Sequence, residues 1–246
     1  MSKSYQQFLK EKSGKTAVYT FGRFNPPTIG HEKLLRVVQT TSSNEGGDYF
    51  IYTSHSQDSK KNPLTHKQTI HFLKLIFPKY RPYIEDSLAK TALDAASEIH
   101  DKGGYTKLMM VVGSDRVRDF SSLLNRYNDK KSKHGYYNFD SIEVISAGER
   151  DPDAEGADGM SASKMRQAVV DGDYDSFKMG VPAGTSDSIC KNLYGAVAKG
   201  LQLKLKEDLG LDDLDELLNP AQLRKLSLRM KVQAKKPGFI KKRQIA

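Results

Sequence analysis

The sequence predicts an α/β fold in which a doubly wound parallel sheet is followed by a C-terminal helical and basic extension. Short apolar segments with strand character alternate with helical segments along residues 16–172, as βαβ units require. The apolar run at 107–115 is continuous, which is typical of a central parallel strand buried on both faces. In sheets of this kind, ligands bind at the carboxyl ends of the strands.

Four segments are predicted to be the main strands. Residues 16–21 (TAVYTF) are β-branched and aromatic, and they lead into a loop with Gly, Asn and two Pro. Residues 48–54 (DYFIYTS) and 141–148 (SIEVISAG) have the same character, and the apolar run at 107–115 lies between them. We expect a further short strand at 80–86 (YRPYIED).

Four segments are predicted to be helical. Residues 31–40 carry apolar side chains at helical intervals. Residues 62–77 open with a turn, offer Thr65 as an N-cap and end before Pro78. Residues 87–104 end at paired glycines, and residues 161–172 begin at an N-cap serine and stop at a glycine.

The charge distribution divides the chain of 246 residues into three parts. The formal net charge is +9, yet residues 219–246 contain nine Lys or Arg and no acid, so residues 1–218 are formally neutral. Six acidic residues at 206–218 precede this basic run. We therefore expect a lead-in over 1–15, one α/β domain over 16–200, and an acidic helix followed by a basic arm over 201–246.

Cysteine content and hydropathy indicate the compartment. Cys190 is the only cysteine, which excludes an internal disulfide and favours a reducing cytosol. We expect it to lie half-buried in a helix. No apolar run approaches the roughly 18 to 20 residues that span a bilayer, and the first 15 residues lack the apolar stretch of a secretory signal. The expected location is the cytoplasm.

The first candidate for chemistry is GRFNPPTIGH at residues 22–31. A loop with two Gly and two Pro leaves the first strand and brings Thr28 and His31 to the start of a helix. Backbone N–H groups at a helix N-terminus favour phosphate, and the hydroxyl and the imidazole would lie near the same point. On its own, the segment is better explained by an ordinary strand–turn–helix connection with a stray histidine.

The second candidate is MSASKMR at residues 160–166. It would place the hydroxyls of Ser161 and Ser163 and the guanidinium of Arg166 at the start of another helix. This combination suits a polyphosphate. Alone, it would be an ordinary capped helix.

Together, the two segments resemble the signature elements of the HxGH nucleotidyltransferase superfamily, in the same order and about 130 residues apart. The superfamily includes nicotinamide mononucleotide adenylyltransferases, phosphopantetheine adenylyltransferases and cytidylyltransferases. GRFNPPTIGH resembles the GxFxPxHxGH element, with Thr28 in place of the first histidine, as in the phosphopantetheine branch. MSASKMR resembles the ISSTxIR element, with Ala162 where a second Ser or Thr is common. The resemblance implies a Rossmann-like domain.

Three further segments resemble parts of the same domain. Residues 52–65 (YTSHSQDSKKNPLT) are similar to the second-strand loop and NPFT turn of archaeal-type nicotinamide mononucleotide adenylyltransferases, although the ER that usually follows is absent. Residues 111–120 (VVGSDRVRDF) resemble the G-x-D loop that holds the ribose and nucleobase side of the substrates. Residues 172–193 resemble the end of the domain, where VP precedes the last helix. The resemblance covers about residues 16–195.

The resemblance implies in-line attack of an acceptor phosphate or hydroxyl on the α-phosphorus of a nucleoside triphosphate, with pyrophosphate as the leaving group. His31 would donate to the α-phosphate oxygens, Thr28 would orient the α-phosphate or the acceptor, and Arg166 would complete the catalytic set. Arg166, Arg23 and Ser163 would bind the β and γ phosphates, with Mg²⁺ bridging them. The residues implied to bind the nucleotide are Gly22, Arg23, Phe24, Asn25, Gly30, Gly113, Asp115, Ser161 and Ser163.

No metal site made of protein ligands is expected. The acidic loop at 151–158 has the composition to hold a metal but is better explained as a solvated loop. Lys60 and Lys61 could contact phosphate from a flexible loop but are better explained as a solvated pair. Five histidines share no ligand spacing with Asp or Glu and are interpreted as structural or exposed: His55, His66, His71, His100 and His134.

The sequence leaves two functions open. In the first, the chain is an adenylyltransferase that uses ATP, or less favourably CTP, and a small phosphorylated acceptor such as nicotinamide mononucleotide; family members are often homo-oligomers. In the second, it is a structural or nucleic-acid-associated protein that retains the domain, and the 219–246 tail binds nucleic acid or an acidic protein surface. A compact domain with a basic arm resembles nucleotidyltransferase-like proteins of tailed bacteriophages, which would place it in a host cytoplasm.

Overall fold

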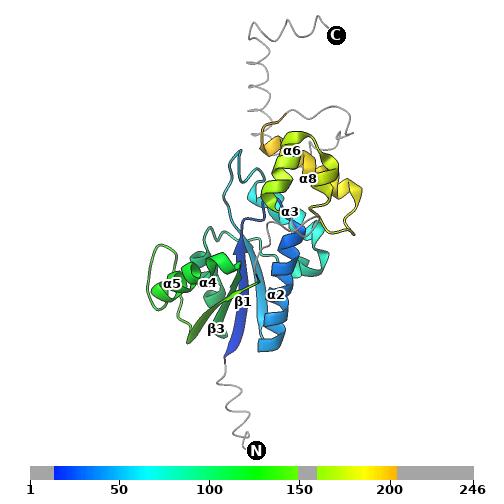
Figure 1. Cartoon of the computed structure of the whole chain (residues 1–246). Helices are drawn as coiled ribbons and strands as arrows, with labels where there is room; N and C mark the ends of the chain where they lie inside the picture. Colours follow the sequence, from blue (N-terminus) through cyan, green and yellow to red (C-terminus); the bar gives the residue numbers. More distant parts are fainter. Residues whose placement is uncertain (1–13, 149–159, 204–246) are drawn as a thin grey trace, which may run out of the picture. The chain divides into compact units, whose positions relative to one another are not determined.

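The computed structural model describes residues 14–148 and 160–203, and within them four strands form one sheet (Figure 1). The strands are β1 (Lys15–Gly22), β2 (Asp48–Thr53), β3 (Tyr105–Val112) and β4 (Ser141–Ser146). Their order is β2-β1-β3-β4, and all neighbouring pairs are parallel. The α/β class, the parallel sheet and the central place of β3 are confirmed.

The direction of the crossovers places a switch point at β1. The chain leaves β1 through α2 (Ile29–Glu45) to reach β2 on one side, and it later returns to β3 on the other side of β1. At a switch point of this kind, the loops after the two central strands diverge and leave room for a ligand. The loop at 22–28 leaves β1 at this position.

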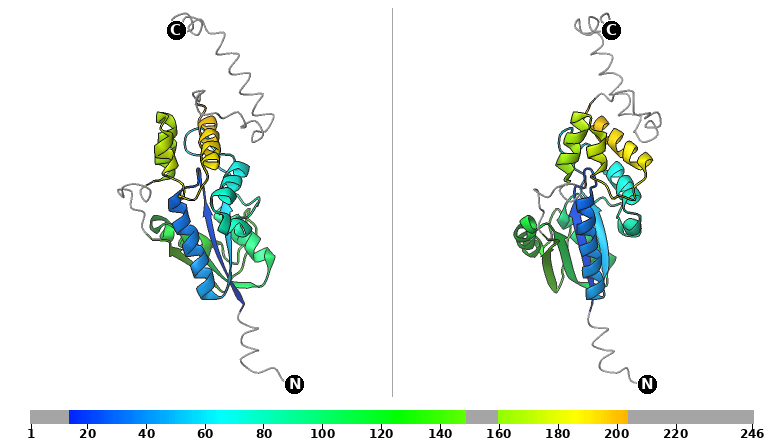
Figure 2. Two further views of the ribbon diagram at one scale, coloured as in Figure 1. Left: turned by 90° about the vertical axis from the view of Figure 1, so that its right-hand side faces the viewer. Right: turned by 45° about the vertical axis from the view of Figure 1, so that its right-hand side comes forward.

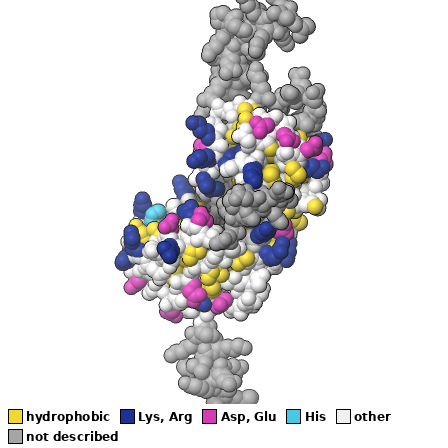
Figure 3. All heavy atoms as spheres, viewed as in Figure 1, with side chains coloured by type: hydrophobic (Ala, Val, Ile, Leu, Met, Phe, Trp, Pro, Cys, Tyr) yellow, Lys and Arg dark blue, Asp and Glu magenta, His cyan; other side chains and the backbone are white. Residues whose placement is uncertain are grey.

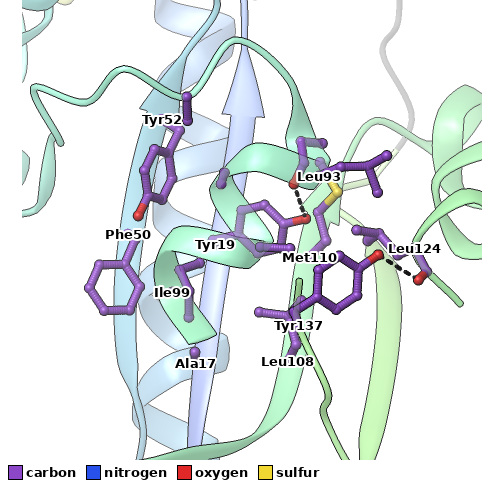
Figure 4. Packing of buried hydrophobic residues seen from close by; sticks show 14 of the residues in the cluster. Ala17, Tyr19, Phe50, Tyr52, Leu93, Ile99, Leu108, Met110, Leu124 and Tyr137 are labelled. Carbon is purple, nitrogen blue, oxygen red and sulfur yellow. Dashed lines mark hydrogen bonds between the residues drawn. The ribbon is translucent and has the colours of Figure 1, made fainter. Parts of the chain in front are cut away.

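Helices cover both faces of the sheet. On one face, Leu35 and Val38 of α2 are fully buried. On the other face lie α4 (Ala92–Lys102) and α5 (Val117–Tyr127). There Tyr19 packs with Ile99 and Leu108, and its hydroxyl donates to the carbonyl of Ala92 over 3.2 Å (Figure 4). Alternate residues of β1 therefore serve two different cores, as a strand buried on both faces requires.

The remaining helices lie beyond the carboxyl ends of the strands. They are α3 (His66–Ile76), α6 (Ala162–Asp171), α7 (Tyr174–Lys178) and α8 (Asp187–Gly200), and the views in Figure 2 show α6 and α8 above the end of β1. The predicted N-caps are confirmed, because Thr65 Oγ1 accepts from Gln68 N over 3.2 Å and Ser161 Oγ accepts from Lys164 N over 3.2 Å. Cys190 lies in α8 as expected, but it is more deeply buried, at 1% exposure.

Residues 80–86 do not form the predicted strand. Residues Pro78–Tyr83 form a 3₁₀ helix, η1, and only Ile84 forms a β-bridge, to Ile51 of β2. Two prolines explain the difference, because Pro78 starts the helix with the φ it prefers and Pro82 has no N–H to donate to a strand neighbour. The segment still covers the outer edge of β2, since Glu85 N donates to Ile51 O over 2.9 Å.

The helix predicted at 87–104 begins later than expected. Thr91 is the N-cap and α4 starts at Ala92, because Thr91 and Asp94 satisfy each other's backbone amides in a capping box. Ser87 instead forms a tight turn by accepting from Ala89 N over 2.9 Å, and the neighbouring Leu88 is 88% exposed. The sequence analysis also did not identify α5, which lies between β3 and β4 after a short 3₁₀ turn, η2 (Ser114–Arg116).

Some predictions fall on other parts of the chain. Residues 1–13, the acidic loop at 149–159 and the extension from residue 204 lie outside the described residues. The domain boundaries and the acidic helix with its basic arm therefore stay predictions. Among the described residues, no helix combines the length and apolar character needed to cross a membrane.

Candidate functional site

The loop after β1 has a conformation that buries an aromatic ring beneath the site. Phe24 is 1% exposed and has a φ of 46°, in the left-handed region that costs energy for a residue with a side chain. Its ring turns back over Gly22, where a Cβ atom would lie 2.8 Å from a ring carbon. A glycine is therefore required at position 22. The Phe24 ring also packs against the imidazole of His31, with ring centroids 4.8 Å apart.

The imidazole of His31 has a defined tautomer. The backbone N–H of Thr28, the N-cap of α2, donates to Nδ1 of His31 over 2.9 Å. A backbone amide can only donate, so Nδ1 accepts and the proton of the neutral ring is on Nε2. The hydroxyl Oγ1 of Thr28 lies 3.1 Å from the same Nδ1 atom. His31 therefore carries a donor on the nitrogen that points away from its own N-cap.

The first amides of α2 do not all have an acceptor among residues 14–148 and 160–203. Ile29 N donates to Gly180 O over 2.8 Å, and His31 N donates to Thr28 O over 2.9 Å. Between them, the Gly30 N–H has no acceptor among the described residues. A Cβ at Gly30 would come no closer than 3.5 Å to any described neighbour, so packing does not require a glycine there. This exposed amide at a helix N-terminus is suited to an anionic ligand.

Asn25 joins two loops. Its Nδ2 donates to Leu64 O over 2.9 Å, and its Oδ1 accepts from Leu64 N over 2.9 Å. The residue is 4% exposed, so the whole amide is used inside the protein. The loop after β1 and the loop after β2 are therefore held together at one point.

Arg166 of α6 reaches this junction from a distance of 141 residues along the chain. Its Nη1 donates to Asn25 O over 2.7 Å, and its Nη2 donates to Ser163 Oγ over 3.0 Å. Burial lowers the pKa of Arg166 first, and the positive charge of Arg23 lowers it further, while Asp58 opposes both. Two guanidinium groups within electrostatic reach of one another form a site for a polyanion.

Further positively charged side chains lie on the surface that Figure 3 shows. Figure 3 shows Lys and Arg side chains along the edge that runs from α6 toward the α5 end of the sheet.

Lys60 and Lys61 are exposed, as expected, but their loop is ordered by Asp58, whose Oδ1 accepts from both backbone amides over 2.8 and 2.6 Å. These hydrogen bonds hold the pKa of Asp58 well below its ordinary value.

The structure brings most of the predicted residues together, but not all of them. Arg166 reaches Asn25 in the loop after β1, and it also bonds Ser163 of its own helix. Ser161 is exposed and caps its own helix. Gly113 and Asp115 lie at the end of β3, next to β1 in the sheet, and no hydrogen bond joins them to the first group within the described residues. Asp115 is exposed there.

Sequence reasoning missed several contributors. Leu64 acts only through its backbone, and Gly180 only through the carbonyl that accepts from Ile29, so neither has a side-chain signal. Asp58 could have been identified, because an Asp two and three residues before backbone amides in a DSKKN turn is a typical Asx pattern.

A pair of stacked histidines stands beside the site. The rings of His55 and His66 lie 3.7 Å apart at an angle of 22°, and His66 Nδ1 is 2.9 Å from Thr53 Oγ1. Thr53 is opposite Gly22 in the sheet, so the pair borders the loop after β1. Burial lowers the pKa of His66, and the charge of His55 lowers it further, whereas Asp86 raises it.

The other histidines have local partners. His134 Nδ1 lies 2.7 Å from Asp94 Oδ1, which attaches the loop after α5 to the start of α4. His71 is exposed, and His100 packs edge-on against Tyr136 and Phe139. Within the described residues, no three His, Cys, Asp or Glu side chains are grouped so that they could hold a metal ion.

The donor set is compatible with a magnesium ion that is bound mainly by phosphate. Mg²⁺ commonly keeps several waters and is held by one or two carboxylates together with substrate phosphates. The cationic and hydroxyl groups around Arg166 would hold those phosphates, not the metal.

The chain matches one family model and is similar to solved structures. The model of a family described as cytidylyltransferase-like matches residues 19–168, which include both signature segments. No curated protein matches the chain. Among solved structures, a chain from Vibrio parahaemolyticus assigned as a nicotinate-nucleotide adenylyltransferase is similar, with 13% identity and a TM-score of 0.42 over 73% of this chain and 98% of that chain. A likeness at this identity and score does not bear on what the present chain binds.

Proposed function

The chain belongs to the cytidylyltransferase-like family of nucleotidyltransferases, and from this premise we propose a specific reaction. The protein transfers the NMP group of a nucleoside triphosphate, preferably AMP, to a phosphate-bearing acceptor such as nicotinamide mononucleotide and releases pyrophosphate. The observation that carries the proposal is the bond from Thr28 N to His31 Nδ1, because it assigns the ring proton to Nε2 at the start of α2.

The chemistry is an in-line displacement at the α-phosphorus. An oxygen of the acceptor forms the new P–O bond while the bond from the α-phosphorus to the bridging oxygen breaks, and that oxygen leaves with pyrophosphate. Catalysis then consists of positioning and charge stabilisation, with no protein nucleophile. The Nε2–H of His31 and the Gly30 N–H donate to the α-phosphate oxygens as negative charge grows.

The leaving group is proposed to lie against α6. Arg166, Arg23 and Ser163 bind the β and γ phosphates, and the exposed hydroxyl of Ser161 is at the same helix end. Mg²⁺, when bound to the triphosphate, neutralises part of its charge. Gly113 and Asp115, at the end of β3, are proposed to contact the ribose and base side. Thr28, which is 3% exposed, orients the α-phosphate or the acceptor through the loop it closes.

The test measures pyrophosphate release over a grid of ATP, CTP, GTP and UTP with several acceptors in the presence of Mg²⁺. The acceptors are nicotinamide mononucleotide, nicotinate mononucleotide, phosphopantetheine and phosphocholine. We expect turnover with ATP and one phosphorylated acceptor, and a fall of about 10²- to 10³-fold in His31→Ala, the size of effect seen when one transition-state donor is removed. His71→Ala is the matched control, because His71 is exposed on α3.

The outcomes separate the alternatives. Turnover with CTP alone would replace the preference for AMP. If no pair turns over and calorimetry detects no binding of ATP or CTP, the reaction proposed here is wrong. The second function considered from the sequence depends on the 219–246 tail, which lies outside the described residues.

A further inference from the structure

Asn25 occupies a position between three separate segments of the chain. Its side chain binds the backbone of Leu64 in the loop after β2, and its own carbonyl accepts from Arg166 Nη1 over 2.7 Å. With 4% exposure and both amide atoms bonded to Leu64, the Asn25 side chain is turned into the protein and not toward a ligand. Any part that Asn25 plays in nucleotide binding must therefore be indirect.

The direction of the Asn25 carbonyl depends on the side chain of the same residue. Two hydrogen bonds of 2.9 Å to one backbone unit anchor the Asn25 side chain, and thereby restrict how far its Cα and the attached carbonyl can move. Arg166 is half-buried, and its guanidinium donates to Asn25 O from Nη1 and to Ser163 Oγ from Nη2. Among the described residues, loss of the carbonyl contact would leave the exposed Ser163 as the one hydrogen-bond partner of this group.

The loop that contains Leu64 also holds a negative charge that acts on Arg166. Asn62, two residues before Leu64, donates from Nδ2 to Asp58 Oδ2, and the Asp58 carboxylate acts electrostatically on Arg166. A shift of Leu64 relative to Asn25 would therefore change both the geometry and the counter-charge of the guanidinium. The position of the Arg166 guanidinium relative to the loop after β2 therefore depends on the contacts of Asn25.

We propose that Asn25 is a positioning residue that sets the Arg166 guanidinium for the β and γ phosphates by tying the loop after β1 to the backbone of Leu64. The role rests on the proposed nucleotidyltransferase function, since Arg166 is proposed to bind the triphosphate there. Asn25 touches neither substrate nor reacting atoms, and its effect passes through Arg166.

The chain contains a matched control for this role. Asn128, at the end of α5, makes the same pair of bonds to a distant residue: Nδ2 donates to Phe139 O over 2.9 Å, and Oδ1 accepts from Phe139 N over 3.0 Å. Asn128 lies on the connection from α5 to β4 and has no contact with Arg166. Asn25→Ala and Asn128→Ala therefore remove the same pattern of bonds, buried at Asn25 and part-buried at Asn128, and we expect only the first to release Arg166.

The first measurement uses the full chain and needs no nucleotide. Phenylglyoxal modifies accessible guanidinium groups, and mass spectrometry of peptides gives the rate at Arg166, with the exposed Arg118 and Arg126 as internal standards. We expect the Arg166 rate to rise several-fold in Asn25→Ala and to stay at the wild-type value in Asn128→Ala. Equal Arg166 rates in all three proteins would overturn the positioning role. If Asn25→Ala does not fold, Asn25→Ser serves, because a serine cannot span both groups of Leu64.

The second measurement is a double-mutant cycle on ATP binding by calorimetry. Asn25→Ala should weaken ATP binding about tenfold in the wild-type background, but less than twofold in Arg166→Lys, where the fork that Asn25 holds is already gone. An equal loss in both backgrounds would indicate a merely structural role and would overturn the proposal. If the wild-type protein binds no triphosphate, the proposed function fails, while the phenylglyoxal rates still decide whether Asn25 positions Arg166.

Discussion

The backbone amide of Thr28 donates to Nδ1 of His31, three residues further along the chain, and thereby determines which nitrogen of the imidazole carries the proton. The bond is local, because both residues belong to the first turn of α2. It also explains how a neutral histidine at this position carries its donor on Nε2. Phe24, packed against the ring, holds the imidazole from the other side.

Two substitutions separate the two nitrogens of His31. In His31→Asn, the amide oxygen can accept from Thr28 N, but no donor reaches the position of Nε2. In His31→Gln, the amide nitrogen reaches that position. We expect pyrophosphate release to fall about 10²- to 10³-fold in His31→Asn and clearly less in His31→Gln, with thermal unfolding little changed in both. Wild-type turnover in His31→Asn would show that Nε2 is not the donor.

Gly30→Ala tests the exposed amide at the start of α2. A Cβ at Gly30 meets no described atom closer than 3.5 Å, and alanine is favoured over glycine in a helix by up to about 1 kcal/mol. We therefore expect unchanged or higher resistance to urea together with weaker ATP binding, because the methyl group occupies the surface that faces the ligand. Gly184→Ala is the control, since a Cβ there meets nothing within 4 Å. ATP affinity equal to that of the control would contradict the assignment.

Phe24→Leu should reduce activity more than its effect on stability explains. Phe24 and Phe139 are 1% and 2% exposed, so replacement of either ring by leucine should lower the free energy of unfolding by about 1 to 3 kcal/mol. Only Phe24 touches the His31 imidazole. We expect kcat to fall several-fold in Phe24→Leu and to remain near wild type in Phe139→Leu. Urea titration and pyrophosphate release measured on the same samples compare the two. A similar kcat in both variants would mean that the ring contact does not orient His31.

The stacked histidines predict a pH dependence of stability. The folded-state pKa of His66 is lowered below its ordinary value near 6.5 by burial and by His55. The unfolded chain therefore binds a proton more readily, and the free energy of unfolding should decrease as the pH falls from about 7 through 6.5 toward that lowered pKa. In His66→Asn, which keeps an atom near the position of Nδ1 to bond Thr53, this loss should be smaller.

Urea titrations at pH 7.5 and pH 5.5 provide the measurement for His66. His71→Asn is the control, because His71 is exposed on the same helix, α3. We expect His71→Asn to lose as much stability between the two pH values as the wild type does. An equal loss in His66→Asn would mean that His66 titrates with an ordinary pKa in the folded protein.

Much of the fold could be predicted because its signals are local. The four strands, the N-caps Thr65 and Ser161, and the stop at Gly172 follow from short-range patterns that the structure confirms. Two of the differences have local causes as well. Pro82 makes residues 80–86 unsuitable as a strand, and the capping box of Thr91 and Asp94 starts α4 later than apolar spacing alone suggests.

Within the site, the sequence by itself determined the family resemblance and the main chemical groups: a threonine and a histidine at one helix start, and serines with an arginine at another. Only the tertiary structure decided how these groups are held. Asn25 meets Leu64 and Arg166 across 39 and 141 residues of chain. Leu64 contributes backbone atoms to the first contact, and Asn25 contributes its backbone carbonyl to the second. Since every residue except proline offers the same N–H and C=O groups, contacts of this kind leave no trace in residue identity. They exist only once the parallel sheet has brought the loops after β1 and β2 and the start of α6 to the same edge.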